Sequence, residues 1–161
     1  MHQKKKNPSY ACRAGGAGFS LMEILVVLAI MGIMATLGLT SFENFQSKAK
    51  NAEAIQAIGF IQKGIYGYEF EFGEWPDSLD QAGKGDILDP WGSPYVYMKI
   101  EGAEKKDDWR KDKHLKPINS DFDLYSMGAD GESKKSITDK ISLDDIIRAN
   151  GGAFIGLAAV Y

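Results

Sequence analysis

The chain has 161 residues, of which 44% are hydrophobic and 25% charged, and its formal net charge at pH 7 is −3. This length and composition fit one globular domain with an appended segment, and they exclude a disordered, collagenous or multi-span membrane protein. Residues 1–18 hold four basic and no acidic side chains, whereas the rest holds 15 basic and 22 acidic ones. A basic head on an acidic body indicates a targeting segment rather than a nucleic-acid-binding domain.

Few residues of the chain have the chemistry that catalysis or transition-metal binding requires. Cys12 is the only cysteine, and His2 and His114 are the only histidines, which excludes a disulfide scaffold and a Cys/His zinc site within one chain. The sequence has no phosphate-binding loop, no H-E-x-x-H motif and no Gly-x-Ser-x-Gly motif. We therefore expect a protein that is not an enzyme.

An uncharged, apolar run extends from Ile24 to Phe42, directly after Glu23. As a helix rising about 1.5 Å per residue it would be roughly 28 Å long, close to the hydrocarbon thickness of a bilayer. The basic residues before it favour a cytoplasmic amino terminus. A secretory signal and a plain signal anchor both contain such a run. Neither explains an acidic residue at its start, which is costly in lipid and indicates a function.

The segment GFSLME at residues 18–23, followed by the apolar run, resembles the class III signal of type IV pilins and type II secretion pseudopilins. The resemblance implies that residues 1–18 are a leader, which a prepilin peptidase removes by cutting after Gly18. It also implies that Phe19 is then N-methylated and that Glu23 serves assembly. A carboxylate and an amine that pair in lipid offset much of each other's cost, and their pairing fixes the register between subunits.

Beyond Phe42 the sequence changes from uniformly apolar to amphipathic without a turn signal. Apolar residues recur every three or four positions as far as Phe72, which predicts a helix with one face packed on a core. Gly73 and Pro76 then end the pattern. We therefore expect one helix from Ile24 to Phe72, with an apolar first half and an amphipathic second half.

The rest of the chain alternates short apolar runs with turn residues. Residues 95–100 and 122–127 are predicted strands. Residues 142–150 predict a short helix capped by Ser142, and the apolar tail 153–161 predicts a strand or segment that packs on the core. Together with the resemblance, these elements indicate an α+β, pilin-like fold: a long amino-terminal helix packed on a small antiparallel β-sheet domain.

Three further blocks resemble the major pseudopilin of the type II secretion system and occur in that family's order. They are GEWP at 73–76, DPWGSPYVY at 89–97 and DLYSMGADG at 123–131. The chain departs from the family in a longer insertion at 101–120 and in residues 132–139, where the family has a glycine-rich, acidic stretch.

The resemblance implies three parts: a cleaved leader at 1–18, a transmembrane and assembly half of the helix at 19–42, and a periplasmic globular domain at 43–161. The implied function is a structural subunit of a type II secretion pseudopilus, which polymerises through its helix to drive protein export across the outer membrane. The subunit would first be a single-pass protein of the inner membrane, with its amino terminus in the cytoplasm and its carboxy-terminal domain in the periplasm.

The implied partners are copies of the chain itself, minor pseudopilins, the prepilin peptidase and methyltransferase, the inner-membrane assembly platform and membrane lipid. One alternative is a major or minor pilin of a type IV pilus for adhesion, motility or DNA uptake. Another is a membrane-anchored periplasmic enzyme or binding module, whose apolar run is only an anchor.

Major pseudopilins typically bind one calcium ion in the carboxy-terminal loop. The resemblance implies ligands from Asp130 and from the backbone carbonyl of Met127, and Asp139 is a candidate for a further ligand at about the right distance in sequence. Calcium takes six to eight oxygens, so further ligands would be needed. Lys134 and Lys135 oppose a cation site, and the alternative is a plain surface turn.

The insertion carries six basic and four acidic residues between positions 104 and 116, around Trp109. A basic patch with an aromatic side chain is one way to contact single-stranded nucleic acid. Because charges of the two signs are interspersed, the pattern favours a solvated loop or a subunit contact instead.

Overall fold

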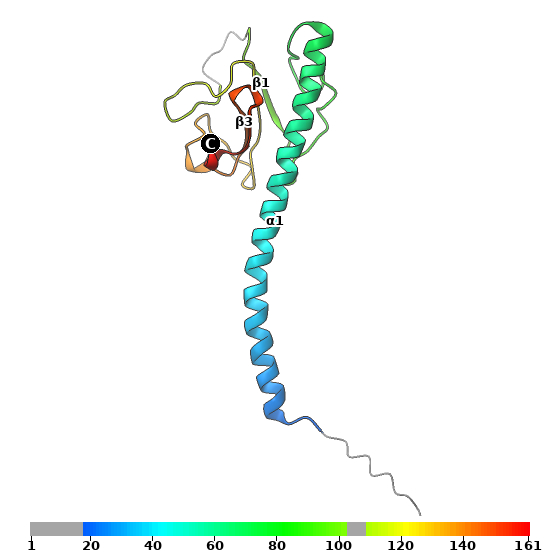
Figure 1. Ribbon diagram of the computed structural model, residues 1–161, viewed down its shortest axis with the longest axis vertical. Helices are drawn as coiled ribbons and strands as arrows, with labels where there is room; N and C mark the ends of the chain where they lie inside the picture. The colour runs from blue at the N-terminus through cyan, green and yellow to red at the C-terminus, as the bar shows by residue number, and fades with distance from the viewer. Residues whose placement is uncertain (1–17, 103–108) are drawn as a thin grey trace, which may run out of the picture. The chain divides into compact units, whose positions relative to one another are not determined.

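The computed structural model describes residues 18–102 and 109–161, except for the side chains of residues 37–41. The chain divides into two compact units between Phe42 and Glu43. Helix α1, Leu21–Phe72, contributes its first part to one unit and its second part to the other (Figure 1). The predicted helix is thus confirmed. It ends as expected at Gly73, whose φ is +76° and whose N–H donates to the carbonyl of Glu69 at 2.8 Å.

In the first unit, α1 begins directly after Ser20. The hydroxyl of Ser20 accepts the N–H of Met22 at 3.2 Å, and its carbonyl accepts the N–H of Glu23 at 3.0 Å. All residues from 18 to 36 are exposed, and most of them are apolar. Among the described residues, no helix is both long enough and apolar enough to cross a membrane. Residues 37–41 of the predicted membrane-spanning run lie outside the described side chains.

In its described residues, the second unit contains one antiparallel sheet, in which the strand order β1-β2-β3-β4 follows the chain. Strand β1 is Val96–Lys99, β2 is Phe122–Ser126, β3 is Ile146–Ala149 and β4 is Phe154–Leu157. The two strands predicted at 95–100 and 122–127 are confirmed as β1 and β2. The apolar tail contains β4, as expected.

The predicted helix at 142–150 is wrong, because these residues form the end of a short 3-10 turn, Lys140–Ser142, and then β3. Every residue of β3 is buried, on both faces of the sheet, whereas a surface helix would leave one face in water. The hydroxyl of Ser142 accepts the N–H of Lys134 at 2.9 Å rather than capping a following helix.

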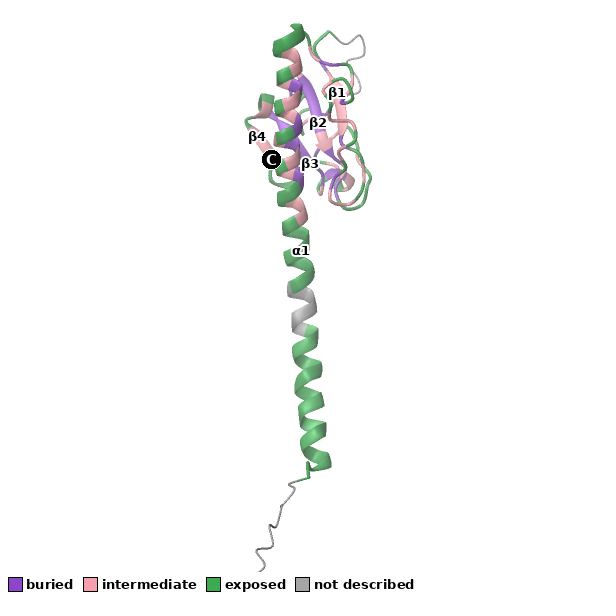
Figure 2. Cartoon of the chain, turned by 90° about the vertical axis from the view of Figure 1, so that its right-hand side faces the viewer, coloured by how far each residue is buried: buried purple, intermediate pink, exposed green. Residues whose placement is uncertain are grey.

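The core lies between α1 and one face of the sheet. Figure 2 shows the buried residues on the side of α1 that faces the strands and along β2 and β3. Side chains alternate along a strand, so β2 and β3 send Phe122, Leu124 and Ile146 toward α1. Their neighbours form a second apolar cluster on the far face, together with buried residues of the loops. The fully buried residues of α1 recur at helical spacing: Ala54, Ile58, Ile61 and Ile65.

Arg148 of β3 connects α1 to the sheet. Its Nη1 and Nη2 donate to the two carboxylate oxygens of Asp121 at 2.9 and 2.5 Å, and Nε donates to Gln62 at 2.7 Å. Nη2 also donates to the hydroxyl of Tyr66 at 2.9 Å, and the guanidinium lies 3.9 Å from the ring centroid of Phe122. Burial alone would raise the pKa of Asp121, but the hydrogen bonds from Arg148 and from the Phe122 N–H hold it below its usual value.

Candidate functional site

The predicted processing residues lie where the chain is exposed and not yet helical. Gly18 and Phe19 precede the first residue of α1, and Phe19 is 76% exposed. A Cβ added to Gly18 would meet nothing within 4 Å. Neither residue is therefore covered by the part of the chain that the structure describes.

Glu23 lies in the first turn of α1 and is exposed. A carboxylate at this position is favoured by the helix dipole, because the free N–H groups of the first turn carry partial positive charge. The structure thus brings the predicted cleavage position and the predicted assembly residue together at one end of the helix.

The three predicted calcium ligands lie in the loop between β2 and β3. Asp130 is exposed, and its carboxylate accepts the N–H of Glu132 at 2.8 Å. Met127 is half-buried directly after β2. Asp139 begins the 3-10 turn: its Oδ1 accepts the N–H of Ile141 at 3.2 Å, and its Oδ2 pairs with the ammonium of Lys134 at 3.2 Å. These two interactions hold the pKa of Asp139 below its usual range.

These ligands do not form a ready calcium site. Among the residues that the structure describes, no group of three or more aspartate, glutamate, histidine or cysteine side chains gathers as a metal centre. Calcium would have to compete with Lys134 for Asp139 and recruit several further oxygens. Calcium binding therefore stays a prediction.

No sequence pattern assigns a role to Asp144, but its side chain holds this loop. Its Oδ2 accepts the N–H groups of Ala129 and Asp130 at 2.8 and 3.2 Å. The close approach needs a glycine at 128, where φ is +68° and an added Cβ would lie 2.5 Å from the carbonyl oxygen of Asp144. The turn is thus closed by a carboxylate of the chain, about fifteen residues further on.

A buried cation from the insertion also holds this loop. Arg110 and Asp145 are both buried, with 2.5 Å between Nη2 and Oδ2. Ser133 accepts a hydrogen bond from Nη1 of Arg110 and donates one to the same oxygen of Asp145 at 2.7 Å. The guanidinium lies 4.2 Å from the ring centroid of Tyr125, on the face of the sheet away from α1. The expectation of a solvated loop is therefore wrong for Arg110.

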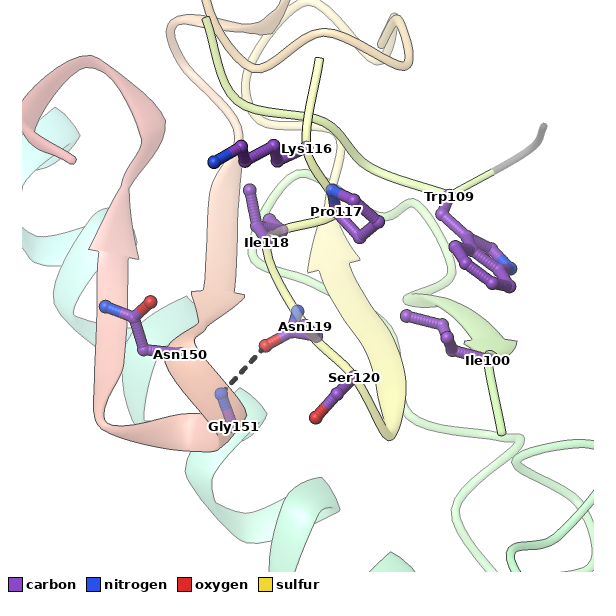
Figure 3. Close-up of a pocket in the computed structure, with 9 residues that line it drawn as sticks. All are labelled: Ile100, Trp109, Lys116, Pro117, Ile118, Asn119, Ser120, Asn150 and Gly151. Carbon is purple, nitrogen blue, oxygen red and sulfur yellow. Dashed lines mark hydrogen bonds between the residues drawn. The ribbon is translucent and has the colours of Figure 1, made fainter. Parts of the chain in front are cut away.

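The insertion lines one side of an open cavity of about 650 Å³. Trp109, Pro117 and Ile118 form part of its wall, and Asn119 accepts the N–H of Gly151 at 3.1 Å across its rim (Figure 3). Of the described residues that line it, Lys116 is the only charged one. The described walls thus lack the row of basic side chains that single-stranded nucleic acid requires.

Comparison with known proteins yields one finding, which concerns the amino-terminal segment. The family model described as the prokaryotic N-terminal methylation motif matches residues 13–39. Searches of curated proteins and of solved structures find no match. The chain therefore carries a type IV pilin-like signal, and its helix packed on an antiparallel sheet agrees with a pilin-like fold.

Substituting Arg110→Met tests the buried pair in the loop. The change leaves the carboxylate of Asp145 buried without its cation, so we expect the free energy of unfolding to fall by about 3 kcal/mol. Lys63→Met, on the exposed side of α1, is the matched control and should change it by less than about 0.5 kcal/mol. Urea unfolding of the detergent-solubilised chain measures both, and equal effects would contradict the role assigned to Arg110.

The calcium prediction is tested by thermal unfolding in calcium and in EDTA. If Asp130 contributes a ligand, added calcium raises the melting temperature of the wild-type chain, because an ion that binds only the folded state stabilises it. Asp130→Asn should abolish that rise, whereas Asp86→Asn, in a different loop, should retain it. A melting temperature that is the same in calcium and in EDTA would exclude a structural ion.

Proposed function

From a type IV pilin-like signal joined to a helix-and-sheet domain, we propose that the protein is the structural subunit of a type II secretion pseudopilus. It polymerises through α1 and drives the export of folded proteins across the outer membrane. The matched segment at residues 13–39, which contains Gly18, Phe19 and Glu23, supports a filament subunit, and the blocks at 73–76, 89–97 and 123–131 favour a pseudopilin over a pilus pilin. The role is mechanical rather than enzymatic.

The geometry of the signal supports processing by a prepilin peptidase. Gly18 and Phe19 are exposed and precede the helix, so a protease can bind the segment in extended form. Cutting there removes the basic leader and leaves the apolar helix in the mature protein. The new amine on Phe19 is then methylated and lies one helical turn from Glu23 in sequence.

Glu23 supplies the contact that orders subunits in this proposal. In lipid, an unpaired carboxylate and an unpaired amine are each expensive, so the amine of one copy and Glu23 of its neighbour attract each other. The exposed apolar residues around them, such as Leu25 and Ile33, need cover from lipid or from other copies. Both needs are met by an inner-membrane pool of subunits that pack helix against helix.

Two of the blocks that suggest a pseudopilin contact each other in the globular unit. Asp89 accepts the N–H groups of Trp91 and Ser93 at 3.1 and 2.8 Å, and its other oxygen accepts the hydroxyl of Ser126 at 2.5 Å. The block at 89–97 therefore braces the end of β2. This contact favours a shared structural role for the blocks within one domain.

The mature amino terminus and a deletion strain together test the proposal. Mass spectrometry of the purified protein should find a chain that begins at N-methylated Phe19. An intact Met1 would reduce the helix to a simple anchor and overturn the proposal.

A strain that lacks the protein should lose exoprotein secretion and keep twitching and transformation. The reverse pattern would instead indicate the alternative, a type IV pilus pilin for motility, adhesion or DNA uptake.

The substitution Glu23→Ala tests assembly separately from processing. We expect cleavage and methylation to continue, while the amount of assembled fibre falls at least about tenfold, which corresponds to a loss of about 1.4 kcal/mol at each contact. Glu43→Ala, an exposed glutamate on the same helix outside the apolar run, should assemble normally. Sheared fibres are quantified by immunoblotting, and normal assembly of Glu23→Ala would remove Glu23 from the mechanism.

A further inference from the structure

The described part of the insertion is an ordered excursion rather than a loose loop. The N–H of Ile118 donates to the carbonyl of Arg110 at 3.0 Å, and the N–H of Asp112 donates to the carbonyl of Lys116 at 2.8 Å. Ile118 is buried in the cluster that includes Ile147 of β3, on the face of the sheet away from α1. The excursion therefore lies across the sheet from α1 (Figure 1), and its tip is residues 112–116.

The tip is braced and displays an apolar side chain. The carboxylate of Asp112 accepts the N–H groups of His114 and Lys116 at 2.8 and 2.9 Å. Leu115 has a φ of +60° and is 73% exposed. A non-glycine residue in this left-handed region costs about 1 kcal/mol or more. The tip thus holds a strained leucine in water, and Lys113 and Lys116, near it in sequence, are exposed as well.

The carboxyl end of α1 has the complementary character. Phe70 is 91% exposed, and Phe72 is also exposed. Their neighbours in the chain, Glu69 and Gly73, line a groove of about 350 Å³. Its lining also includes Glu74 and Glu101, and the carboxylate of Glu101 accepts the indole N–H of Trp75 at 2.6 Å. The one described cation of its lining, Lys99, pairs with Asp77 at 3.1 Å. This end of α1 therefore presents both carboxylates and exposed aromatic side chains.

We infer that the tip of one copy docks at this end of α1 in a second copy, with Leu115 against Phe70 and the lysines of the tip facing the groove. The charges are of opposite sign, and the described structure leaves Leu115 on one surface, and Phe70 and Phe72 on the other, exposed. Because the two surfaces lie on different sides of one globular unit, the contact is heterologous and repeats from copy to copy. It rests on the proposed function and adds a contact between globular domains to the packing of the apolar helices.

Paired cysteines test this contact in the full-length chain. Processing removes Cys12, the only cysteine, so disulfides in the mature protein form only between introduced residues. Carried on one chain, Leu115→Cys and Phe70→Cys should yield a ladder of dimers, trimers and longer species on mild oxidation in cells. Each single variant should yield dimers at most. Leu115→Cys combined with Val160→Cys is the matched control, because Val160 is 77% exposed but outside both surfaces, and it should give no ladder.

Charge exchange on the same double-cysteine chain tests the electrostatic part. Lys113→Glu or Glu74→Lys alone should reduce the ladder, up to about fivefold, the range expected for an exposed ion pair. The two together should restore most of it, since the attraction is re-formed with its signs reversed. A loss with no recovery in the combined variant would overturn the assignment of these charges to one contact.

The outcomes separate this inference from the proposed function. Normal fibres and N-methylated Phe19 without a ladder would overturn the contact and leave the pseudopilin role intact. An uncut Met1 would overturn both. If mass spectrometry finds the tip cysteine linked to a different protein in place of a second copy, the surface is an interface but the occupant inferred here is wrong.

Discussion

The globular unit depends on one buried guanidinium, that of Arg148. It donates to Asp121 ahead of β2 and to Gln62 and Tyr66 of α1, and its own strand lies between two others. A buried charge without partners costs several kcal/mol. The helix α1 must therefore pack on the sheet in the one alignment that gives Arg148 all of these acceptors. The apolar contacts of the core stabilise the globular unit, and the hydrogen bonds of Arg148 set the position of α1 on the sheet.

A second guanidinium gives the far face of the sheet the same kind of constraint. Arg110 stacks on Tyr125, as Arg148 stacks on Phe122, and both rings belong to β2. Side chains alternate in direction along a strand. Because Phe122 and Tyr125 are three positions apart, the two cations lie on opposite faces of the sheet. The first fastens the helix and the second fastens the insertion and the loop before β3. The sequence of the insertion is that of a polar surface loop, but the contacts of Arg110 hold its described part in place and so support the tip at 112–116.

The sequence predicted elements whose signals are local. The amphipathic period and Gly73 defined the second half of α1, and contiguous residues around Gly18 and Glu23 defined the signal. The pattern at 142–150 predicts a helix because Ser142 and Arg148 stand at capping positions. The structure instead gives them partners from distant parts of the chain, Lys134 and Asp121. The same holds for Asp144 and Asp145 in the loop, since spacing along the chain does not reveal which distant amide or cation a carboxylate meets.

The position of β3 near the end of the chain has a consequence for the time course of folding. Gln62 and Arg148 are 86 residues apart, although each strand of the sheet pairs with its neighbour in sequence. The apolar face of α1 is therefore synthesised well before the strand β3 that helps to cover it. Contacts between residues so far apart in sequence also form slowly. During that interval the nascent helix exposes Ile58, Ile61 and Ile65 to other chains. The unfinished subunit, rather than the completed domain, is thus the form most prone to premature association.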